Sequence, residues 1–249
     1  MTDSNDIQQK VLSYKKQFEN SDIETVLLFF LNQYRGKIAL ASSFGAEDQA
    51  LTHLLWSLDH SIRVFTLDTG RLNQETYDVM QETRIKYNIP IEITFPDSQA
   101  VTEMVNKHGP NLFYESVEKR KMCCGVRKVQ PLRKKLAELD VWITGLRREQ
   151  SVTRSDIAVI EYDETHDMIK LNPLAEWTND QVWAYISANE VPYNKLHDLG
   201  YPSIGCACCT RAVLSGQDIR AGRWWWEEPE TKECGLHIKD GKLVRKKGQ

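Results

Sequence analysis

Apolar positions along the chain first repeat at helical spacing and then gather in short runs. Two stretches within residues 7–34 predict two amphipathic helices that end before Gly36. Downstream, short apolar runs that are typical of buried strands alternate with helical stretches. The runs are 37–41, 63–67, 91–95 and 141–144, and the helical stretches are one through Leu55, one over 74–87 and one over 116–138. This alternation predicts an α/β fold in which helices flank a parallel sheet.

A hairpin and one further helix are predicted after the fourth strand. Residues 157–162 and 168–171 are two short apolar segments on either side of a polar turn, which is typical of a hairpin. Thr178 can cap a helix over 179–189, with its apolar side chains facing inward. These elements extend the predicted α/β unit almost to residue 210.

The pattern fades from about residue 211. Glycines and Pro229 interrupt it, and the three tryptophans at 224–226 lie in its middle. We interpret residues 211–249 as an extended C-terminal arm that the tryptophans seat by packing. We therefore expect two parts, an α/β domain over 1–210 and the arm over 211–249.

Three loops at predicted strand ends carry small or polar residues. They are Ser42-Ser43-Phe44-Gly45, Asp68-Thr69-Gly70-Arg71 and Gly145-Leu146-Arg147-Arg148. Ligands of parallel α/β sheets bind outside the carboxyl ends of the strands, and a Ser/Gly-rich loop that opens a helix can hold an oxyanion or a nucleotide. The first loop alone is a weak signal, because it is neither a Walker A motif nor a dinucleotide fingerprint and could be a plain strand-to-helix turn. Three such loops together favour a ligand site.

Composition places the chain among ordinary soluble proteins. The 249 residues are 41% hydrophobic and 27% charged, and the net charge of −3 argues against a general nucleic-acid binder. The first residues resemble no signal peptide, and no apolar run reaches the length of a membrane helix. We expect a cytoplasmic protein without a membrane segment. In that reducing compartment its six cysteines are expected to be ligands or nucleophiles.

Four cysteines suggest a metal centre. Cys123 and Cys124 are neighbours, and Cys206 and Cys209 form a C-x-x-C pair about eighty residues later. Four thiolates suit zinc or an iron–sulfur cluster. Neighbouring side chains normally point apart, so a cluster with several iron corners accommodates the adjacent pair more readily than one zinc ion does. The pattern therefore favours [4Fe–4S].

Basic residues and one further cysteine add candidates. Lys128 follows the cysteine pair within one helical turn, where a cation would offset an anionic thiolate cluster and attract an anion. Other candidate cations are Arg127, Arg147, Arg148, Arg220 and Arg223, whereas Lys134 and Lys135 are interpreted as a solvated face. Cys234 lies among polar residues near His237, so it is either a reactive thiol or an inert surface cysteine.

Taken together, these motifs resemble the assimilatory sulfonucleotide reductases over residues 36–240. The segments that carry the resemblance are Ser42–Glu47, Leu67–Gly70, Cys123–Lys128, Ile143–Gln150, Leu196–Cys206, Arg220–Trp224 and Glu233–His237. The resemblance implies a nucleotide-binding domain of the adenine-nucleotide α-hydrolase type. It also implies an oxidoreductase of sulfate assimilation and cysteine biosynthesis.

The resemblance assigns roles to individual residues. Cys234 is implied as the thiolate that attacks the sulfur of adenylyl sulfate, which releases AMP and leaves an S-sulfocysteine. Thioredoxin, or alternatively glutaredoxin, then reduces this intermediate and releases sulfite. The positions that match substrate-binding residues of the family are Lys128, Arg220, Arg223 and His237 for the phosphosulfate, and Ser42, Ser43, Gly45 and Arg127 for the nucleotide.

The cysteine set selects the subclass. Cys123, Cys124, Cys206 and Cys209 match the ligands of the [4Fe–4S] branch, which is associated with adenylyl sulfate rather than its 3′-phosphorylated form. The alternative is a phosphoadenylyl-sulfate reductase, or an enzyme active on both substrates. Cys208 departs from the family pattern and could be a spectator, an alternative ligand or a site of oxidation. A homo-oligomer is compatible with this picture.

Two other function classes share parts of the pattern. An ATP-pyrophosphatase of the same fold needs a Ser-Gly-Gly-x-Asp-Ser-like loop, which Ser42–Glu47 is not. A non-catalytic zinc-stapled binding module would use the same four cysteines, but it leaves Cys234 and the strand-end loops unexplained. The sequence therefore favours the reductase over both.

Overall fold

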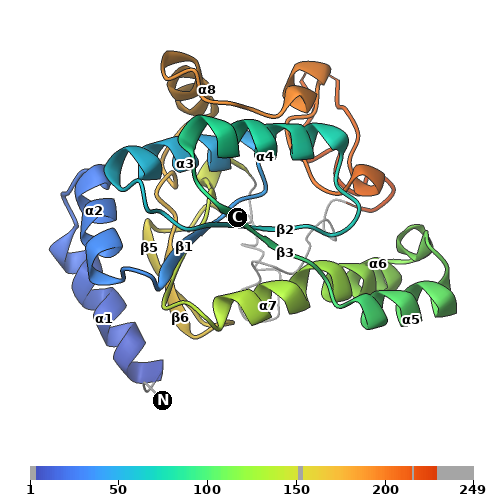
Figure 1. Ribbon diagram of the computed structural model, residues 1–249, viewed down its shortest axis with the longest axis horizontal. Helices are drawn as coiled ribbons and strands as arrows, with labels where there is room; N and C mark the ends of the chain where they lie inside the picture. Colours follow the sequence, from blue (N-terminus) through green and yellow to red (C-terminus); the bar gives the residue numbers. More distant parts are fainter. Residues whose placement is uncertain (1–3, 151–153, 215, 229–249) are drawn as a thin grey trace, which may run out of the picture.

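The computed structural model describes residues 4–150, 154–214 and 216–228, and within them one six-stranded sheet organises the fold. The strand order is β3-β2-β1-β4-β6-β5 (Figure 1). All neighbouring strands are parallel except β5 and β6, which form an antiparallel hairpin. The predicted α/β class, the four parallel strands and the hairpin are therefore confirmed.

The bounds of the elements follow the predicted ranges closely. The strands are β1 Ile38–Ala41, β2 Val64–Leu67, β3 Ile91–Thr94, β4 Val141–Ile143, β5 Ile160–Asp163 and β6 Met168–Leu171. The α-helices are α1 Ser4–Gln17, α2 Ile23–Gln33, α3 Ala46–Leu58, α4 Gln74–Tyr87, α5 Ser98–His108, α6 Val117–Cys124, α7 Gln130–Leu136 and α8 Asn179–Ala188. Short 3-10 helices cover Leu112–Tyr114, Arg148–Gln150, Lys195–Leu199 and Ala207–Cys209.

Both faces of the sheet are buried, as expected for parallel strands between helices. On β1, Ile38 and Leu40 face the larger core, which α2, α3 and α8 complete, whereas Ala39 faces a smaller core. The smaller core includes Leu132 and Leu136 of α7. Figure 1 shows α3 and α4 on one side of the sheet and α7 on the other. This arrangement leaves the carboxyl ends of the strands open to a ligand.

The helical run predicted over 116–138 has a π-helical segment in its middle. The α-helix α6 ends at Cys124, a π-helix covers Gly125–Val129, and α7 begins at Gln130. The wide turn is closed by a hydrogen bond from the Gln130 N–H to the Gly125 carbonyl. Pro131 follows immediately and has no N–H to donate, which disfavours a regular α-helix at this point. π-Helical turns are frequent at functional sites because they change which side chains share a face.

The helix predicted over 179–189 and its cap are confirmed. The Thr178 hydroxyl accepts from the Gln181 N–H, and the Gln181 side chain accepts from the Thr178 N–H, so the two form a capping box. Val182 and Ile186 are buried in the larger core, as predicted. Trp183 is only half-buried and lies edge-on to His197.

Two features differ from the sequence-based interpretation. Helix α5 lies in a stretch to which we assigned no element, because few apolar residues mark its buried side and Met104 alone is fully buried. Lys135 is not solvated but buried, with its Nζ 2.6 Å from Glu92 and 2.7 Å from Glu138. Its partners come from β3 and from the turn that follows α7, and the pairing with β3 is not revealed by local sequence.

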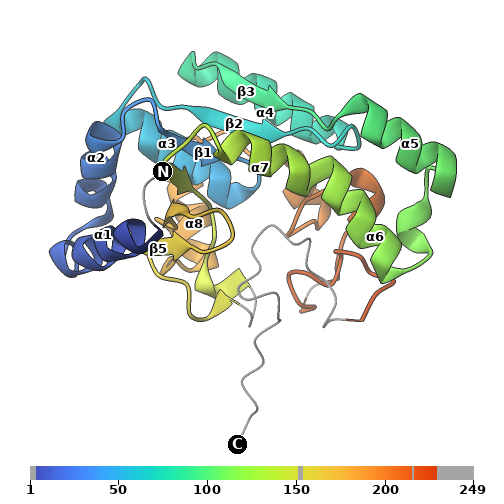
Figure 2. The ribbon, with the colours of Figure 1, turned by 90° about the horizontal axis from the view of Figure 1, so that it is seen from below.

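The first part of the predicted arm packs against the helical run. Thr210 forms a bridge with Arg223, and the side chain of Trp224 is only 1% exposed. Figure 2 shows the last described residues beside α6. A boundary at residue 210 between two parts stays a prediction. Within the part of the chain that the structure describes, no helix has the length and apolarity needed to cross a membrane.

Candidate functional site

A pocket of about 240 Å³ opens at the carboxyl ends of the strands. The loops after β1 and β4 line it with Ser42, Ser43, Gly45 and Gly145, whereas the loop after β2 contributes Leu72 alone among the described residues, and its Arg71 lines a second pocket. Later segments complete the wall with Lys128, Gln150, Arg154, His197, Ser203, Ile204, Arg220 and Arg223. Two of the three predicted loops therefore meet at this pocket, whereas Asp68, Thr69, Gly70 and Arg71 do not line it, which corrects the prediction for the loop after β2.

The loop after β1 makes a strained turn into α3. Phe44 has a φ of 58°, in the left-handed region that a bulky side chain rarely adopts, and it is fully buried beside Val79 and Met80 of α4. The Phe44 N–H donates to the Ser42 hydroxyl over 3.1 Å. Helix α3 begins at Ala46 with no side-chain cap, so the N–H groups of its first turn can bind an anion in the pocket.

Asp48 fixes the position of Ser43. One carboxylate oxygen of Asp48 accepts from the Ser43 N–H over 2.6 Å and from the Ser43 hydroxyl over 2.7 Å. Burial raises the pKa of Asp48 to about 6, although the hydrogen bonds from Ser43 act in the opposite direction. Ser43 itself is exposed and lines the pocket. Its hydroxyl is therefore held in place by a buried acid and faces the ligand space.

Replacing Gly145 by alanine is expected to disturb this arrangement. A Cβ at Gly145 would lie 2.3 Å from an Asp48 carboxylate oxygen, so Asp48 would have to leave Ser43. We expect Gly145→Ala to weaken binding of AMP, the nucleotide that the resemblance implies for this pocket, about tenfold and to lower the free energy of unfolding by about 1–3 kcal/mol. Equilibrium dialysis and urea unfolding measure the two effects, and AMP binding of wild-type strength would contradict the role given to Asp48.

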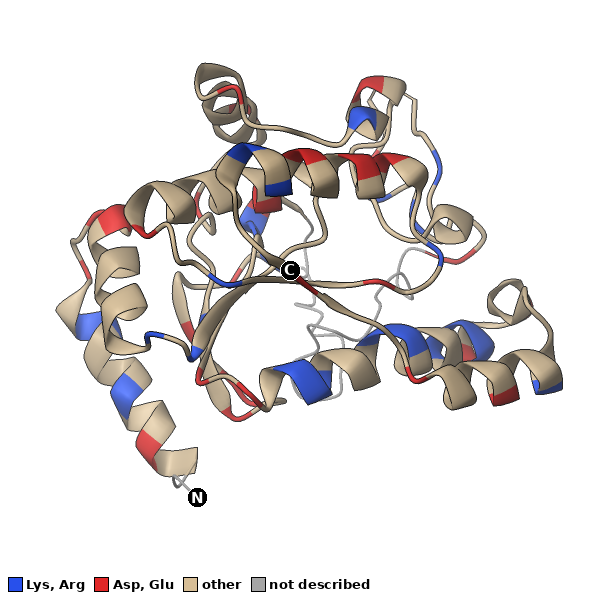
Figure 3. Ribbon diagram, viewed as in Figure 1, with Lys and Arg blue, Asp and Glu red and all other residues tan. Residues whose placement is uncertain are grey.

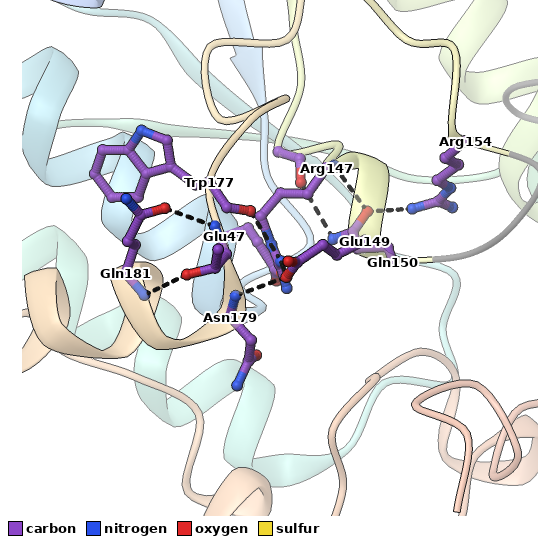
Figure 4. A network of polar contacts seen from close by, with 10 residues as sticks. Glu47, Arg147, Glu149, Gln150, Arg154, Trp177, Asn179 and Gln181 are labelled. Atoms are coloured by element: carbon purple, nitrogen blue, oxygen red, sulfur yellow. Dashed lines mark hydrogen bonds and ion pairs between the residues drawn. The ribbon is translucent and has the colours of Figure 1, made fainter.

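Arg147 is a structural residue rather than a ligand of the pocket. It is 1% exposed, and its guanidinium donates to Glu47 over 2.8 and 3.0 Å, to the Trp177 carbonyl and to Glu149 (Figure 4). Arg148 is exposed and pairs with Glu176. Neither arginine lines the pocket, which corrects their interpretation as candidate anion-binding cations. Arg147 instead joins the loop after β4 to the start of α3.

The remaining cations lie where an anion could reach them. Lys128, Arg220 and Arg223 all line the strand-end pocket. Arg223 is 7% exposed and donates to the Ser203 hydroxyl and the Ile204 carbonyl, so its guanidinium is fixed in the wall. Basic residues recur along α6, the π-helix and α7, where they colour the ribbon blue in Figure 3. A negative ligand in this pocket would therefore meet several positive groups.

Arg127, the neighbour of Lys128 in the sequence, has different surroundings. It is buried, and its Nη1 donates to the Thr69 carbonyl over 2.6 Å. It lines a second pocket instead of the strand-end pocket, so the structure does not bring it into line with Ser42, Ser43 and Gly45. Its bond to Thr69 ties the π-helix to the loop after β2.

The second pocket, of about 20 Å³, is lined by cysteines. Cys123 and Cys124 of α6 meet Cys206 and Cys209 there, although about eighty residues separate the pairs in the sequence. Cys123, Cys124 and Cys209 are buried, Cys206 is half-buried, and the Cys206 Sγ lies 3.2 Å from the Thr69 Oγ1. The two pockets share Lys128 and Arg223. Lys128 and Arg223 therefore form a cationic wall between the cysteine pocket and the strand-end pocket.

The donor set fits a thiophilic centre. Four thiols converge on one pocket, and arginine and lysine side chains around it can balance the charge of bound thiolates. Within the described residues, no three His, Cys, Asp or Glu side chains are grouped for one metal ion. Cys208 also lines the pocket, with its Sγ 3.8 Å from that of Cys209. The thiols thus provide ligands of the type that an iron–sulfur cluster uses.

Some site residues lie outside the described part of the chain, and others were missed. The proposed nucleophile Cys234 and its neighbour His237 belong to residues 229–249, which the structure does not describe. Arg71 and Arg120 line the cysteine pocket but were not singled out. The spacing of Arg120 to Cys123, Cys124 and Arg127 is that of one helix face, a signal that could have found it.

Comparisons with known proteins agree with this geometry. Residues 37–212 match the family described as the phosphoadenosine phosphosulfate reductase domain. A protein from Burkholderia cepacia named adenosine 5′-phosphosulfate reductase is 52% identical over 212 residues, which cover 85% of each chain. One of the same name from Allochromatium vinosum is 50% identical over 203 residues, 82% of this chain and 79% of that protein.

Solved structures place the fold in the same group. The crystal structure of a phosphoadenylyl-sulfate reductase from Candida auris, a phosphate complex, matches with a TM-score of 0.69 and 27% identity over 80% of this chain and 95% of that one. Yeast FAD synthetase, at 13% identity and a TM-score of 0.53 over 84% of this chain and 76% of that one, shares the fold alone. The chain therefore belongs to the phosphoadenosine phosphosulfate reductase family of oxidoreductases, the sulfonucleotide reductases.

Proposed function

We propose that this chain reduces adenylyl sulfate to sulfite and AMP during sulfate assimilation. The observation that carries the proposal is that Lys128 and Arg223 line both the strand-end pocket and the cysteine pocket. If the adenosine of adenylyl sulfate lies in the strand-end pocket and its phosphosulfate points toward the cysteine pocket, the anionic phosphosulfate would contact both cations. The relatives named adenosine 5′-phosphosulfate reductase, about 50% identical to this chain, support the same substrate.

The strand-end pocket has the features needed to hold the nucleotide. Ser42, Ser43 and Gly45 present hydroxyl and N–H groups at the start of α3, where a phosphate oxygen can accept hydrogen bonds. Arg220 enters the same pocket from the C-terminal segment and can neutralise the phosphosulfate together with Lys128 and Arg223. Charge neutralisation makes the sulfur accessible to a thiolate nucleophile.

The reaction proceeds in two steps, transfer of the sulfonate to Cys234 and then its release as sulfite by thiol–disulfide exchange. The Cys234 thiolate attacks the sulfur of adenylyl sulfate, an S–S bond forms, the bond from sulfur to the phosphate oxygen breaks, and AMP leaves with the electron pair. His237 would contribute to binding the sulfonate. A thioredoxin thiolate then attacks the sulfenyl sulfur of Cys234, sulfite leaves with the electron pair, and the second thioredoxin thiol resolves the mixed disulfide. Glutaredoxin is the alternative donor.

We assign a [4Fe–4S] cluster to the cysteine pocket. Cys123, Cys124, Cys206 and Cys209 would hold it, with Cys208 as a neighbour rather than a ligand. The bound cluster would supply electrostatic and structural support, because the thiol couple carries both electrons. Arg127 and Lys128 would face its negative charge, which keeps the cationic wall between the two pockets in place. We therefore also propose a cytoplasmic location, where the reducing environment keeps cysteine ligands and a nucleophilic thiol in the reduced state.

Adenylyl sulfate is expected to be reduced in strong preference to its 3′-phosphorylated form. The test is sulfite release by anaerobically purified protein that contains iron and sulfide, with thioredoxin and the two substrates side by side. Strong preference for adenylyl sulfate supports the proposal. Preference for the 3′-phosphorylated form would favour the alternative, a phosphoadenylyl-sulfate reductase, and absence of sulfite from both would contradict the reductase assignment.

A further inference from the structure

The turn over residues 223–227 is strained and pressed against the cysteine pocket. Trp224 has a φ of 42° and is 1% exposed, although a bulky residue rarely adopts the left-handed region. Its N–H donates to the Cys209 carbonyl over 3.1 Å, and its carbonyl accepts from the Glu227 N–H over 2.8 Å. Strain of this kind persists only where surrounding contacts hold it, and it concentrates at functional sites.

A buried ion pair holds this turn to α6. The Arg120 guanidinium donates to both carboxylate oxygens of Glu227, over 2.8 and 2.7 Å, and the two side chains are 0% and 3% exposed. The same guanidinium lies 4.7 Å from the centre of the Trp224 ring. Arginine suits this role because its planar fork matches a carboxylate and its face stacks on an indole.

Arg120 also reaches the cysteine site. It lines the cysteine pocket, and it interacts with the Cys124 thiol in addition to Glu227. One guanidinium therefore contacts a cysteine of the pocket, the strained tryptophan and the last buried acid of the described chain. The sequence separation is large, because Arg120 and Glu227 are 107 positions apart.

We infer that Arg120, Trp224 and Glu227 form a latch that anchors the C-terminal segment to the cysteine pocket and thereby positions Cys234 for attack. The inference rests on the proposed function of Cys234. Arg120 and Glu227 act as positioning residues, since neither lines the strand-end pocket.

The position of the latch limits where Cys234 can go. Cys234 lies seven positions after Glu227, and a chain of that length reaches at most about 25 Å. If the latch opens, the C-terminal segment is still held at Arg223 by its bridge with Thr210, and Arg223 lies eleven positions before Cys234. If that bridge also opens, the last fixed residue before Cys234 is Thr210. Relative to the closed latch, the effective concentration of the Cys234 thiol at the substrate is expected to fall about twofold when the latch opens and about sixfold when the bridge opens as well.

Trypsin cleavage after Arg223 tests the latch without any assay of activity. Arg223 is 7% exposed, so cleavage there requires the turn to open. In protein matched for iron content, Glu227→Gln is expected to increase the rate of this cleavage about tenfold or more, because the charge-assisted bonds to Arg120 are lost. The control is Glu228→Gln, which removes the same charge from the exposed neighbouring position and is expected to leave the rate unchanged.

Combining substitutions distinguishes a latch from a general loss of stability. Arg120→Gln with Glu227→Gln is expected to increase cleavage no more than the more severe single variant does, because both remove one interaction. Cleavage of Glu227→Gln at the wild-type rate would overturn the latch. This outcome is independent of the proposed function, which fails if wild-type protein releases no sulfite.

A single-turnover experiment tests the positioning role. Glu227→Gln is expected to form the sulfonated Cys234 two- to sixfold more slowly than wild type, while its affinity for AMP stays the same. Intact mass measurement after mixing with adenylyl sulfate, in the absence of thioredoxin, follows this step. An unchanged rate of sulfonation in protein that trypsin shows to be unlatched would contradict the positioning of Cys234 by the latch.

Discussion

Replacing Cys234 by serine is expected to abolish sulfite release from adenylyl sulfate. A serine hydroxyl is a far weaker nucleophile than a thiolate at neutral pH, and an alkyl sulfate on serine could not be reduced by a dithiol. The rate should therefore fall at least about 10³-fold. Sulfite release from adenylyl sulfate, measured with saturating thioredoxin, quantifies the loss.

The same variant should keep the rest of the site. The substitution leaves the four cysteines assigned to the cluster and the described residues that line the two pockets unchanged, so the iron content of the variant and its affinity for AMP are expected to equal those of wild type. Incubation with adenylyl sulfate alone should add one sulfonate group to the wild-type peptide that contains residue 234 and none to the serine variant. A sulfonate found on another cysteine of the wild-type protein, such as Cys208, would sink the assignment of Cys234.

The fold was predictable because its signals are local. Each parallel strand is a short apolar run, since both of its faces are buried, and the helix over 74–87 was predicted with the bounds that the structure shows. The capping box of Thr178 and Gln181 likewise needs only four consecutive residues. Helix α5 was missed because it buries Met104 alone. Helix formation there depends on contacts that periodicity does not report.

The site was predictable in its chemistry but less so in its contacts. The C-x-x-C spacing and the adjacent Cys123–Cys124 pair identified the four thiols, which the fold brings to one pocket. The roles of Arg147 and Lys135 were predicted wrongly, since a charged residue in a loop or at the end of a helix gives no sign of a distant partner such as Glu47 or Glu92. Long-range ion pairs become visible only in three dimensions.

The π-helix explains why the basic residues after the cysteine pair have different surroundings. Five residues instead of four separate donor and acceptor at Gly125–Val129, which shifts the face on which each following side chain lies. Arg127 is buried against Thr69, whereas Lys128 lines both pockets. A regular helix predicted from periodicity alone would not distinguish these two neighbours. The irregular turn thus places Lys128 in the wall between the cysteine pocket and the strand-end pocket.

Lys128→Gln is therefore expected to lower kcat/KM for adenylyl sulfate by about 10²–10³-fold. In the proposed reaction, negative charge moves from the sulfonate toward the leaving phosphate during attack, and a neutral amide at position 128 would stabilise that charge less than an ammonium group does. Affinity for AMP should fall much less, because AMP, the product nucleotide, lacks the sulfonate. Steady-state measurements of kcat and KM, together with AMP binding, separate the contribution of Lys128 to catalysis from its contribution to nucleotide binding.

Lys134→Gln provides the matched control. It removes the same charge from the same helical run, but Lys134 is exposed on α7 and lines neither pocket. If long-range charge alone mattered, the two variants would lose similar activity, and added salt would reduce the difference of each from wild type. A local role predicts a large and salt-insensitive loss for Lys128→Gln only. Equal losses in the two variants would show that the position of Lys128 between the pockets has no special effect.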